Sequence, residues 1–340
     1  MKKVISLILC IALLVLGSSV AFAAEDKGTG FGAYKHVYIV GIDGSGAAWE
    51  MYDTPNFHRI FGDGAYRTDC ITEYETISAQ NWGSILTGVA YDVHGFTNEN
   101  TDFAKRKSAP DNETIFRYVR NAMPDANLVS IVHWANINYG IIEDDLGIKK
   151  INRLSDPMVA DAVGNYLLFH KAPALMFVHL DDVDHAGHTY GGQTAEYEKA
   201  VIKADEHLGI IYDNICKTGG MEDSLFILVA DHGEANGGGH GGHSAEEEAV
   251  TVAVTGKNVN KMTLPEGTRN RDVAAIALYA LGIDQPQYMT AKVPAGLFGE
   301  EHEINTDAPA ATFEQVAMKF LYFFVRFANV VCSPFDFLVK

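Results

Sequence analysis

Carboxylates and imidazoles in this sequence gather directly after several apolar stretches. Asp43 follows one stretch in "GIDGSG", and Asp231 and His232 end another in "VADHGE". Two further groups lie in "HLDDVDHAGHTYGG" (179–192) and "NGGGHGGHS" (236–244). Buried carboxylates need a partner or must be neutralised, and a divalent metal is the usual partner of Asp and His together. The pattern predicts a metal site, with zinc favoured because a pure Mg²⁺ or Ca²⁺ site would not need several imidazoles.

A candidate nucleophile lies in "YETISAQNWGSILTG" (74–88). Ser78 falls at the junction between an extended stretch and a helix that we expect to start near Gln80. A hydroxyl at that point lies on the positive end of the helix dipole, which favours an alkoxide and a bound phosphoryl oxygen. The same position equally suits a simple N-cap residue. Thr76 is a rival nucleophile.

These residues need a scaffold that brings distant segments together. Continuous runs rich in Val and Ile predict buried strands, and amphipathic stretches between them predict helices. The expected strands are 36–42, 127–133, 174–180 and 225–231, and the expected helices are 80–87, 113–122, 156–169, 193–216 and 270–281. Alternating strands and helices predict an α/β fold, a mostly parallel sheet with helices on both faces. Ligands of such sheets bind beyond the carboxyl ends of the strands, where the acidic and histidine groups fall.

The order of these motifs resembles the alkaline phosphatase superfamily, and most closely its type I phosphodiesterase/nucleotide pyrophosphatase branch. The motifs are "VGIDG", "SAQNWGSILTG", an Asp-x-x-x-His step, "DHG" and "GHGG", and they span about residues 36–255. The segment "TPNFHRIFGDGA" (54–65) is also similar to that branch. The resemblance implies an alkaline-phosphatase-like three-layer sandwich, which we assign to residues 24–305 as one catalytic domain.

The resemblance also implies roles for individual residues. One divalent ion is expected at Asp43, Ser78, Asp231 and His232, and a second at Asp184, His188 and His240. Spacing to Asn81 and to Thr87-Gly88 selects Ser78 over Thr76 as the nucleophile, and Asn81 is expected to hold a non-bridging oxygen. His240 is preferred over His243 because Gly-His-Gly-Gly matches the family, while His185, Asp181 and Asp182 are expected next to the ligands rather than among them. The implied activity is hydrolysis of a small-molecule phosphoester through a phosphoserine, with two ions, most readily Zn²⁺.

The nucleophile segment departs from the phosphodiesterase pattern of threonine followed by an aromatic residue and proline. Ser78 is followed by Ala79 and Gln80, which leaves monoester and diester substrates both open. A formylglycine sulfatase is disfavoured because Gln80 and Trp82 occupy the positions of its Pro or Ala and its Arg. A phosphomonoesterase, a phosphoryl transferase, a sulfatase-like hydrolase and a non-catalytic surface-binding module remain the alternatives.

The two ends of the chain carry their own signals. Residues 1–23 combine a lysine pair, an apolar run and Ala21-Phe22-Ala23, which predicts a cleaved signal peptide and a secreted or cell-surface protein. In the tail (306–340), the pattern of residues 312–331 predicts an amphipathic helix, expected either to pack on the domain or to lie on a membrane surface or in a partner groove. A net charge of −18 argues against nucleic-acid binding by bulk charge.

Overall fold

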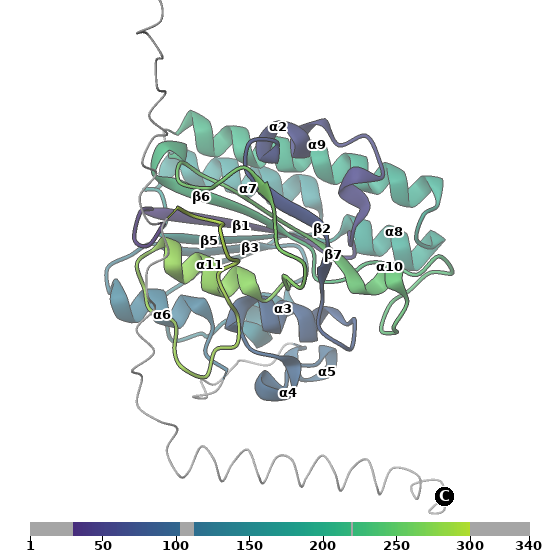
Figure 1. Ribbon diagram of the computed structural model, residues 1–340, viewed down its shortest axis with the longest axis horizontal. Helices are drawn as coiled ribbons and strands as arrows, with labels where there is room; N and C mark the ends of the chain where they lie inside the picture. The colour runs from purple at the N-terminus through teal and green to yellow at the C-terminus, as the bar shows by residue number, and fades with distance from the viewer. Residues whose placement is uncertain (1–29, 103–111, 219, 300–340) are drawn as a thin grey trace, which may run out of the picture.

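A single eight-stranded sheet lies at the centre of the protein (Figure 1). The computed structural model describes residues 30–299 except 103–111 and 219, so the predicted signal peptide (1–23) and tail (306–340) lie outside the described residues. The strand order is β4-β3-β5-β1-β6-β7-β2-β8. The strands are β1 (His36–Ile42), β2 (Ala65–Ile71), β3 (Leu128–Val132), β4 (Lys149–Asn152), β5 (Leu175–Leu180), β6 (Ser224–Val229), β7 (Ala249–Thr255) and β8 (Met262–Thr263).

The middle of the sheet is parallel, as predicted. Strand β1 pairs in parallel with β5 on one side and β6 on the other, and β3 continues the parallel order beyond β5. Every residue of β3, β5 and β6 is buried, which explains their continuous apolar sequence. Because Ile42 pairs with Leu180 and Gly41 with Val229, the carboxyl ends of β1, β5 and β6 meet at one edge.

Helices cover both faces of the sheet (Figure 1). One apolar core packs α3, α6 and α11 under the sheet, and a second packs α2, α7, α8 and α9 over it. The helices are α2 (Pro55–Phe61), α3 (Ser78–Thr87), α4 (Tyr91–His94), α5 (Asn98–Thr101), α6 (Ile115–Ala122), α7 (Asp156–Phe169), α8 (Asp182–Tyr190), α9 (Ala195–Lys217), α10 (Ala245–Glu248) and α11 (Asp272–Ala280), with shorter turns η1 (Ala48–Glu50), η2 (Ile137–Ile141) and η3 (Met221–Asp223). The three-layer α/β prediction is confirmed.

Two features of the fold differ from the sequence-based expectation. The sheet extends beyond the four expected strands through β2, β4, β7 and β8, and β7 runs antiparallel to both β6 and β2. Strands β2 and β4 expose part of their length because they lie toward the sheet edges, so their sequences are mixed rather than apolar. In addition, α3 begins at Ser78 itself and not near Gln80.

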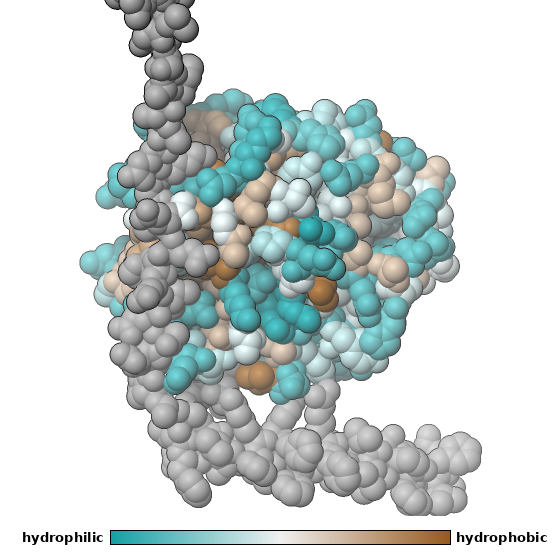
Figure 2. Space-filling model, in the orientation of Figure 1, coloured by the Kyte–Doolittle hydropathy of each residue, from teal (hydrophilic) through white to brown (hydrophobic). Residues whose placement is uncertain are grey.

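The face of the domain seen in Figure 2 is mainly hydrophilic, and its apolar residues are scattered. Among residues 30–299, outside the gaps at 103–111 and 219, no helix is both long and apolar enough to cross a membrane.

Candidate active site

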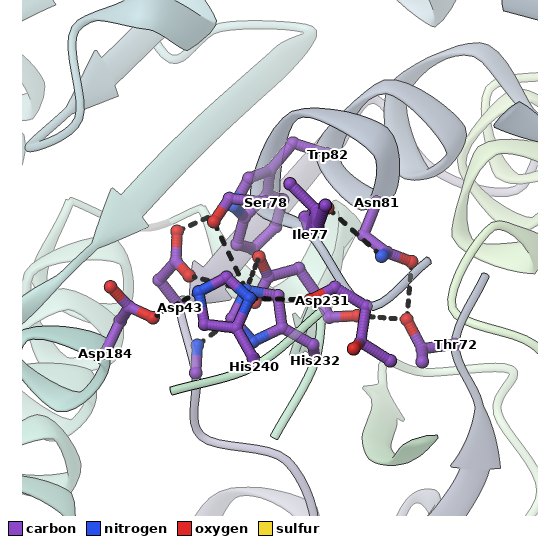
Figure 3. Close-up of polar contacts among 12 residues, drawn as sticks. Asp43, Thr72, Ile77, Ser78, Asn81, Trp82, Asp184, Asp231, His232 and His240 are labelled. Carbon is purple, nitrogen blue, oxygen red and sulfur yellow. Dashed lines mark hydrogen bonds and ion pairs between the residues drawn. The ribbon is translucent and has the colours of Figure 1, made fainter. Parts of the chain in front are cut away.

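The sheet edge collects the acidic and histidine groups that the sequence places after three strands. Asp43 follows β1, Asp184 lies in the first turn of α8 just after β5, and Asp231 and His232 follow β6. The strand register holds these segments side by side, so side chains separated by up to about 190 positions converge (Figure 3).

Ser78 faces this group from the start of α3. It is the first residue of the helix, follows the extended residue Ile77, and is 8% exposed. Its Oγ lies 3.2 Å from Nε2 of His232. The hydroxyl therefore stands at the positive end of a ten-residue helix and within reach of the acidic cluster.

Asp43, Asp231 and His232 form the first candidate metal group. Nε2 of His232 lies 3.2 Å from Oδ2 of Asp231 and 3.5 Å from Oδ1 of Asp43. The ring donates its Nδ1 proton to the carbonyl oxygen of Gly233, so Nε2 carries a lone pair. Burial, followed by the charge of His240, lowers the pKa of His232 to about 3, which keeps the ring neutral. Two carboxylate oxygens thus face an imidazole lone pair, an arrangement that a cation stabilises.

The two carboxylates each keep one oxygen available. Oδ2 of Asp43 accepts hydrogen bonds from Trp82 Nε1 at 2.8 Å and His179 Nε2 at 2.9 Å. Oδ1 of Asp231 accepts from the Gly44 backbone N–H at 3.1 Å. The other two oxygens, Oδ1 of Asp43 and Oδ2 of Asp231, are buried without a hydrogen-bond partner among the described residues. Orphaned buried oxygens of this kind fit a metal ion.

Asp184, His188 and His240 form the second candidate group. Nε2 of His240 lies 3.0 Å from Nε2 of His188 and 3.4 Å from Oδ1 of Asp184, and Nε2 of His188 lies 3.5 Å from Oδ2 of Asp184. His240 donates Nδ1–H to the carbonyl oxygen of Thr76 at 2.6 Å, so its Nε2 also presents a lone pair. The rings of His232 and His240 stack 3.7 Å apart, which joins the two groups.

The close spacing of the buried acids makes it unfavourable for all of them to be ionised. Burial, followed by the charges of Asp43, Asp181 and Glu234, raises the pKa of Asp184 to about 11. Burial and the charge of Asp43 also raise the pKa of Asp231 well above its usual value. These carboxylates cannot all be charged together without a compensating cation. The residues present therefore fit divalent metal ions.

The sequence match agrees with this site. Residues 37–241, more than half of the chain, match the family described as type I phosphodiesterase/nucleotide pyrophosphatase. The chain belongs to this family. The family segment begins in β1 and ends just after His240, so it contains all seven predicted ligands.

Curated relatives of this phosphodiesterase-family chain include transferases and mutases. GPI ethanolamine phosphate transferase 1 of Saccharomyces cerevisiae is 26% identical over 181 residues, which cover 47% of this chain and 19% of the transferase. The 2,3-bisphosphoglycerate-independent phosphoglycerate mutase of Listeria monocytogenes serotype 4b is 36% identical over 129 residues, covering 36% of this chain and 22% of the mutase. The matched part of the chain thus spans about a fifth of each of these relatives.

Solved structures confirm the alkaline-phosphatase-like fold. Murine ectonucleotide pyrophosphatase/phosphodiesterase 5, in an inactive variant in complex with AMP, has a TM-score of 0.62 at 14% identity and covers 77% of this chain and 97% of that chain. A protein of the alkaline phosphatase superfamily from Vibrio parahaemolyticus has a TM-score of 0.57 at 16% identity, covering 78% and 70%. At such identities the likeness concerns the fold alone.

Within this family site, the structure assigns Asn81 a task that contradicts its predicted role. Its amide hydrogens are directed to the carbonyl oxygens of Glu73, Glu75 and Ile77, and its Oδ1 accepts from Thr72 and from the Glu73 N–H. In Figure 3 its side chain points toward Thr72 and not toward Asp184. Asn81 is fully buried and ties the segment before Ser78 to α3, so it has no free donor for a substrate oxygen.

Asn98 is an exposed residue that contacts the position after the nucleophile. Its Oδ1 accepts the backbone N–H of Ala79 at 3.0 Å, which places its amide group beside the first turn of α3. Twenty positions separate it from Ser78, and neither composition nor periodicity singles it out. Its neighbourhood with Ser78 exists only in the folded chain.

The structure also distinguishes Ser78 from Thr76 and His240 from His243. Thr76 is completely buried, and its Oγ1 donates to the Gly242 carbonyl oxygen and accepts the Gly241 N–H, so it braces the loop that carries His240. The side chain of His243 is 61% exposed, stacks on Tyr74, and lies 2.6 Å from Glu248. His240, and not His243, therefore faces the site.

Asp181 and Asp182 start α8 and are held by a buried aspartate. Asp156 accepts both of their backbone N–H groups, at 2.8 and 3.0 Å, and also lies 2.9 Å from Nδ1 of His133. Because Asp156 fixes the first turn of α8, it also fixes the position of Asp184 in that turn.

Proposed function

We propose that this chain is a metal-dependent phosphoester hydrolase of the phosphodiesterase/nucleotide pyrophosphatase type that acts through a phosphoserine at Ser78. One observation carries the proposal: Oγ of Ser78 stands at the helix N-terminus 3.2 Å from a His232 nitrogen that also faces two carboxylates. A hydroxyl in this setting is placed to become a nucleophile, and the surroundings suit an anionic substrate only when cations are bound.

The proposed ligand sets are Asp43, Ser78, Asp231 and His232 for one divalent ion and Asp184, His188 and His240 for a second. Zinc is our first choice because imidazole nitrogen and carboxylate oxygen together suit it. Ions bound there lower the pKa of a coordinated hydroxyl and neutralise charge on a leaving oxygen.

The chain's own residues define the reaction path. Oγ of Ser78 attacks phosphorus, the Oγ–P bond forms, and the bond from phosphorus to the leaving oxygen breaks. The serine proton passes to solvent and the leaving oxygen takes up a proton. Water then attacks phosphorus, the Oγ–P bond breaks, and Ser78 regains its proton. We expect the positive end of α3, and the amide of Asn98 beside its first turn, to hold a non-bridging oxygen in both steps.

A phosphoryl or phosphoethanolamine transferase is the second candidate, because the chain is 26% identical over 181 residues to an enzyme named GPI ethanolamine phosphate transferase 1. Both candidates share the phosphoserine step and differ in whether water or an alcohol takes the phosphoryl group. A diester is our first choice of substrate for the hydrolase.

The test compares wild type with Ser78→Ala on p-nitrophenyl phosphate, bis(p-nitrophenyl) phosphate and p-nitrophenyl sulfate, with added Zn²⁺. We expect diester cleavage to fall on the order of 10⁴-fold or more in the variant. Unchanged cleavage by Ser78→Ala would refute the assignment of Ser78 as the nucleophile. Adding an alcohol acceptor separates the candidates: a transferase forms the new ester in preference to free product, and a hydrolase does not.

We also propose that the protein is exported, because residues 1–23 have the pattern of a signal peptide, and that the amphipathic segment 312–331 makes peripheral membrane contact. The mature protein should then begin at Ala24, which N-terminal sequencing of the purified native protein measures. Deletion of the residues after 311 should release membrane-bound protein. A mature chain that retains Met1 contradicts the cleaved signal.

A further inference from the structure

Glu234 is a fourth acid in the site, beyond the seven predicted ligands. It lies two residues after His232 in the loop that follows β6, and it is 3% exposed. Both of its carboxylate oxygens are buried, and neither has a hydrogen-bond partner among the described residues. A carboxylate removed from water in this way needs a cation or a proton.

The fold leaves space for this side chain. Gly187 lies on α8 one turn after Asp184, so both face the same side of the helix. A Cβ added at Gly187 would lie 2.3 Å from Cγ and 2.8 Å from Oε2 of Glu234, closer than atoms can approach. The Glu234 carboxyl group therefore occupies the space that a larger residue at 187 would fill, next to Asp184.

The neighbours of Glu234 are metal-binding groups. One ligand atom each from Asp184, His232, Glu234 and His240 lies within 4.8 Å of all the others. Ligands about 2.1 Å from one ion are separated by roughly 3–4 Å, so small shifts bring these atoms to a common centre. The Nε2 atoms of His232 and His240 already present lone pairs toward this group.

We propose that Glu234 is a ligand of the ion that Asp184 and His240 bind. This inference rests on the metal site of the proposed function, and it adds a second carboxylate to that ion. Carboxylate oxygen is preferred by harder ions such as Mn²⁺, whereas imidazole favours Zn²⁺. Glu234 therefore raises the affinity for both ions and raises it more for Mn²⁺.

The experiment measures metal binding rather than activity. Wild type, Glu234→Gln and Glu143→Gln are stripped with a chelator and titrated with Mn²⁺ and with Zn²⁺ by calorimetry. Glu143 is a matched control because it is a buried glutamate that binds the N–H and hydroxyl of Thr114, away from the site. We expect Glu234→Gln to weaken one of two binding events by 10-fold to 100-fold, more for Mn²⁺ than for Zn²⁺, and Glu143→Gln to leave both unchanged.

A second variant keeps the test valid if Glu234→Gln does not fold. Gly187→Ala retains the glutamate, adds a good helix former, and displaces the carboxyl group, so it should weaken the same binding event. Wild-type affinity for both ions in Glu234→Gln, or in Gly187→Ala, would overturn the proposal. If wild type itself binds no metal, both this proposal and the metal site fail. If wild type binds two ions but cleaves no ester, the weakened binding in Glu234→Gln still supports the ligand role, and the proposed function alone fails.

Discussion

His179 offers the sharpest test of how the fold prepares Asp43 for a metal. It lies in β5, is completely buried, and its Nε2 donates to Oδ2 of Asp43 at 2.9 Å. Trp82 donates to the same oxygen, which leaves Oδ1 facing His232. Burial alone would raise the pKa of Asp43, but the hydrogen bond and charge of His179, together with His232 and Trp82, lower it below its usual value.

His179→Leu removes one of two donors from a buried carboxylate while keeping a similar volume. A hydrogen bond to a charged group contributes about 1.5–3 kcal/mol, so the free energy of unfolding of the metal-free protein should fall by that amount. Asp43 is then held by Trp82 alone, and metal affinity should fall about 10-fold to 100-fold. His179→Gln can still donate and should recover part of both losses.

The assay pairs urea unfolding in a chelator with calorimetric titration of Zn²⁺. His94→Leu is the control, because His94 is also buried and hydrogen-bonded, to Ser84 and to the Gln80 carbonyl oxygen, but does not contact Asp43. It should lose comparable stability and keep its metal affinity. The reasoning is refuted if His179→Leu loses stability yet binds Zn²⁺ as tightly as wild type.

Two further predictions concern the asparagines and the metal-free acids. Asn98→Ala should lower kcat for the diester by about 10²-fold with little change in the urea midpoint of unfolding. Asn81→Ala should instead lower that midpoint. If Asn81→Ala lowers kcat and Asn98→Ala lowers the midpoint, Asn81 has the substrate-binding role predicted from the sequence. Burial raises the pKa of Glu234 from 4.5 to about 7, so the folded metal-free protein binds more protons than the unfolded chain between those values. Its stability should therefore fall as pH rises from about 4.5 to about 7, and saturating Zn²⁺ should remove this dependence; melting temperatures that rise over this range in chelator would contradict it.

Much of the site could be predicted because the placement of its residues depends on the local sequence. An aspartate or histidine directly after a buried parallel strand must lie at the carboxyl edge of the sheet, whatever the rest of the chain does. Asp43, Asp231 and His232 are of this kind, and Asp184 lies within the first turn after its strand. Ser78 was open to two interpretations from its local sequence, and its placement 3.2 Å from His232 brings it to the same edge.

Only the tertiary structure decided which groups surround those residues. Asn81 follows Ser78 by three positions and Asn98 by twenty, which favours Asn81 from sequence alone. In the folded chain the loop before α3 uses the donors of Asn81, while Asn98 is exposed beside Ala79. The hydrogen bond from His179 to Asp43 joins residues that are 136 positions apart in the sequence. Pairings of this kind depend on strand register and on how helices settle on the sheet.

Glu234 shows most clearly what the local sequence determines and what depends on tertiary packing. The sequence by itself determined that acids and imidazoles would meet at one edge of a parallel sheet. The reason is that the strands, and the residue types that follow them, can be read from the local sequence. It did not determine that Glu234 would turn inward, since an acid in a glycine-rich loop is ordinarily exposed. That outcome required Gly187, on a different element, to leave room beside Asp184, and close packing between elements is settled only when the whole chain has folded.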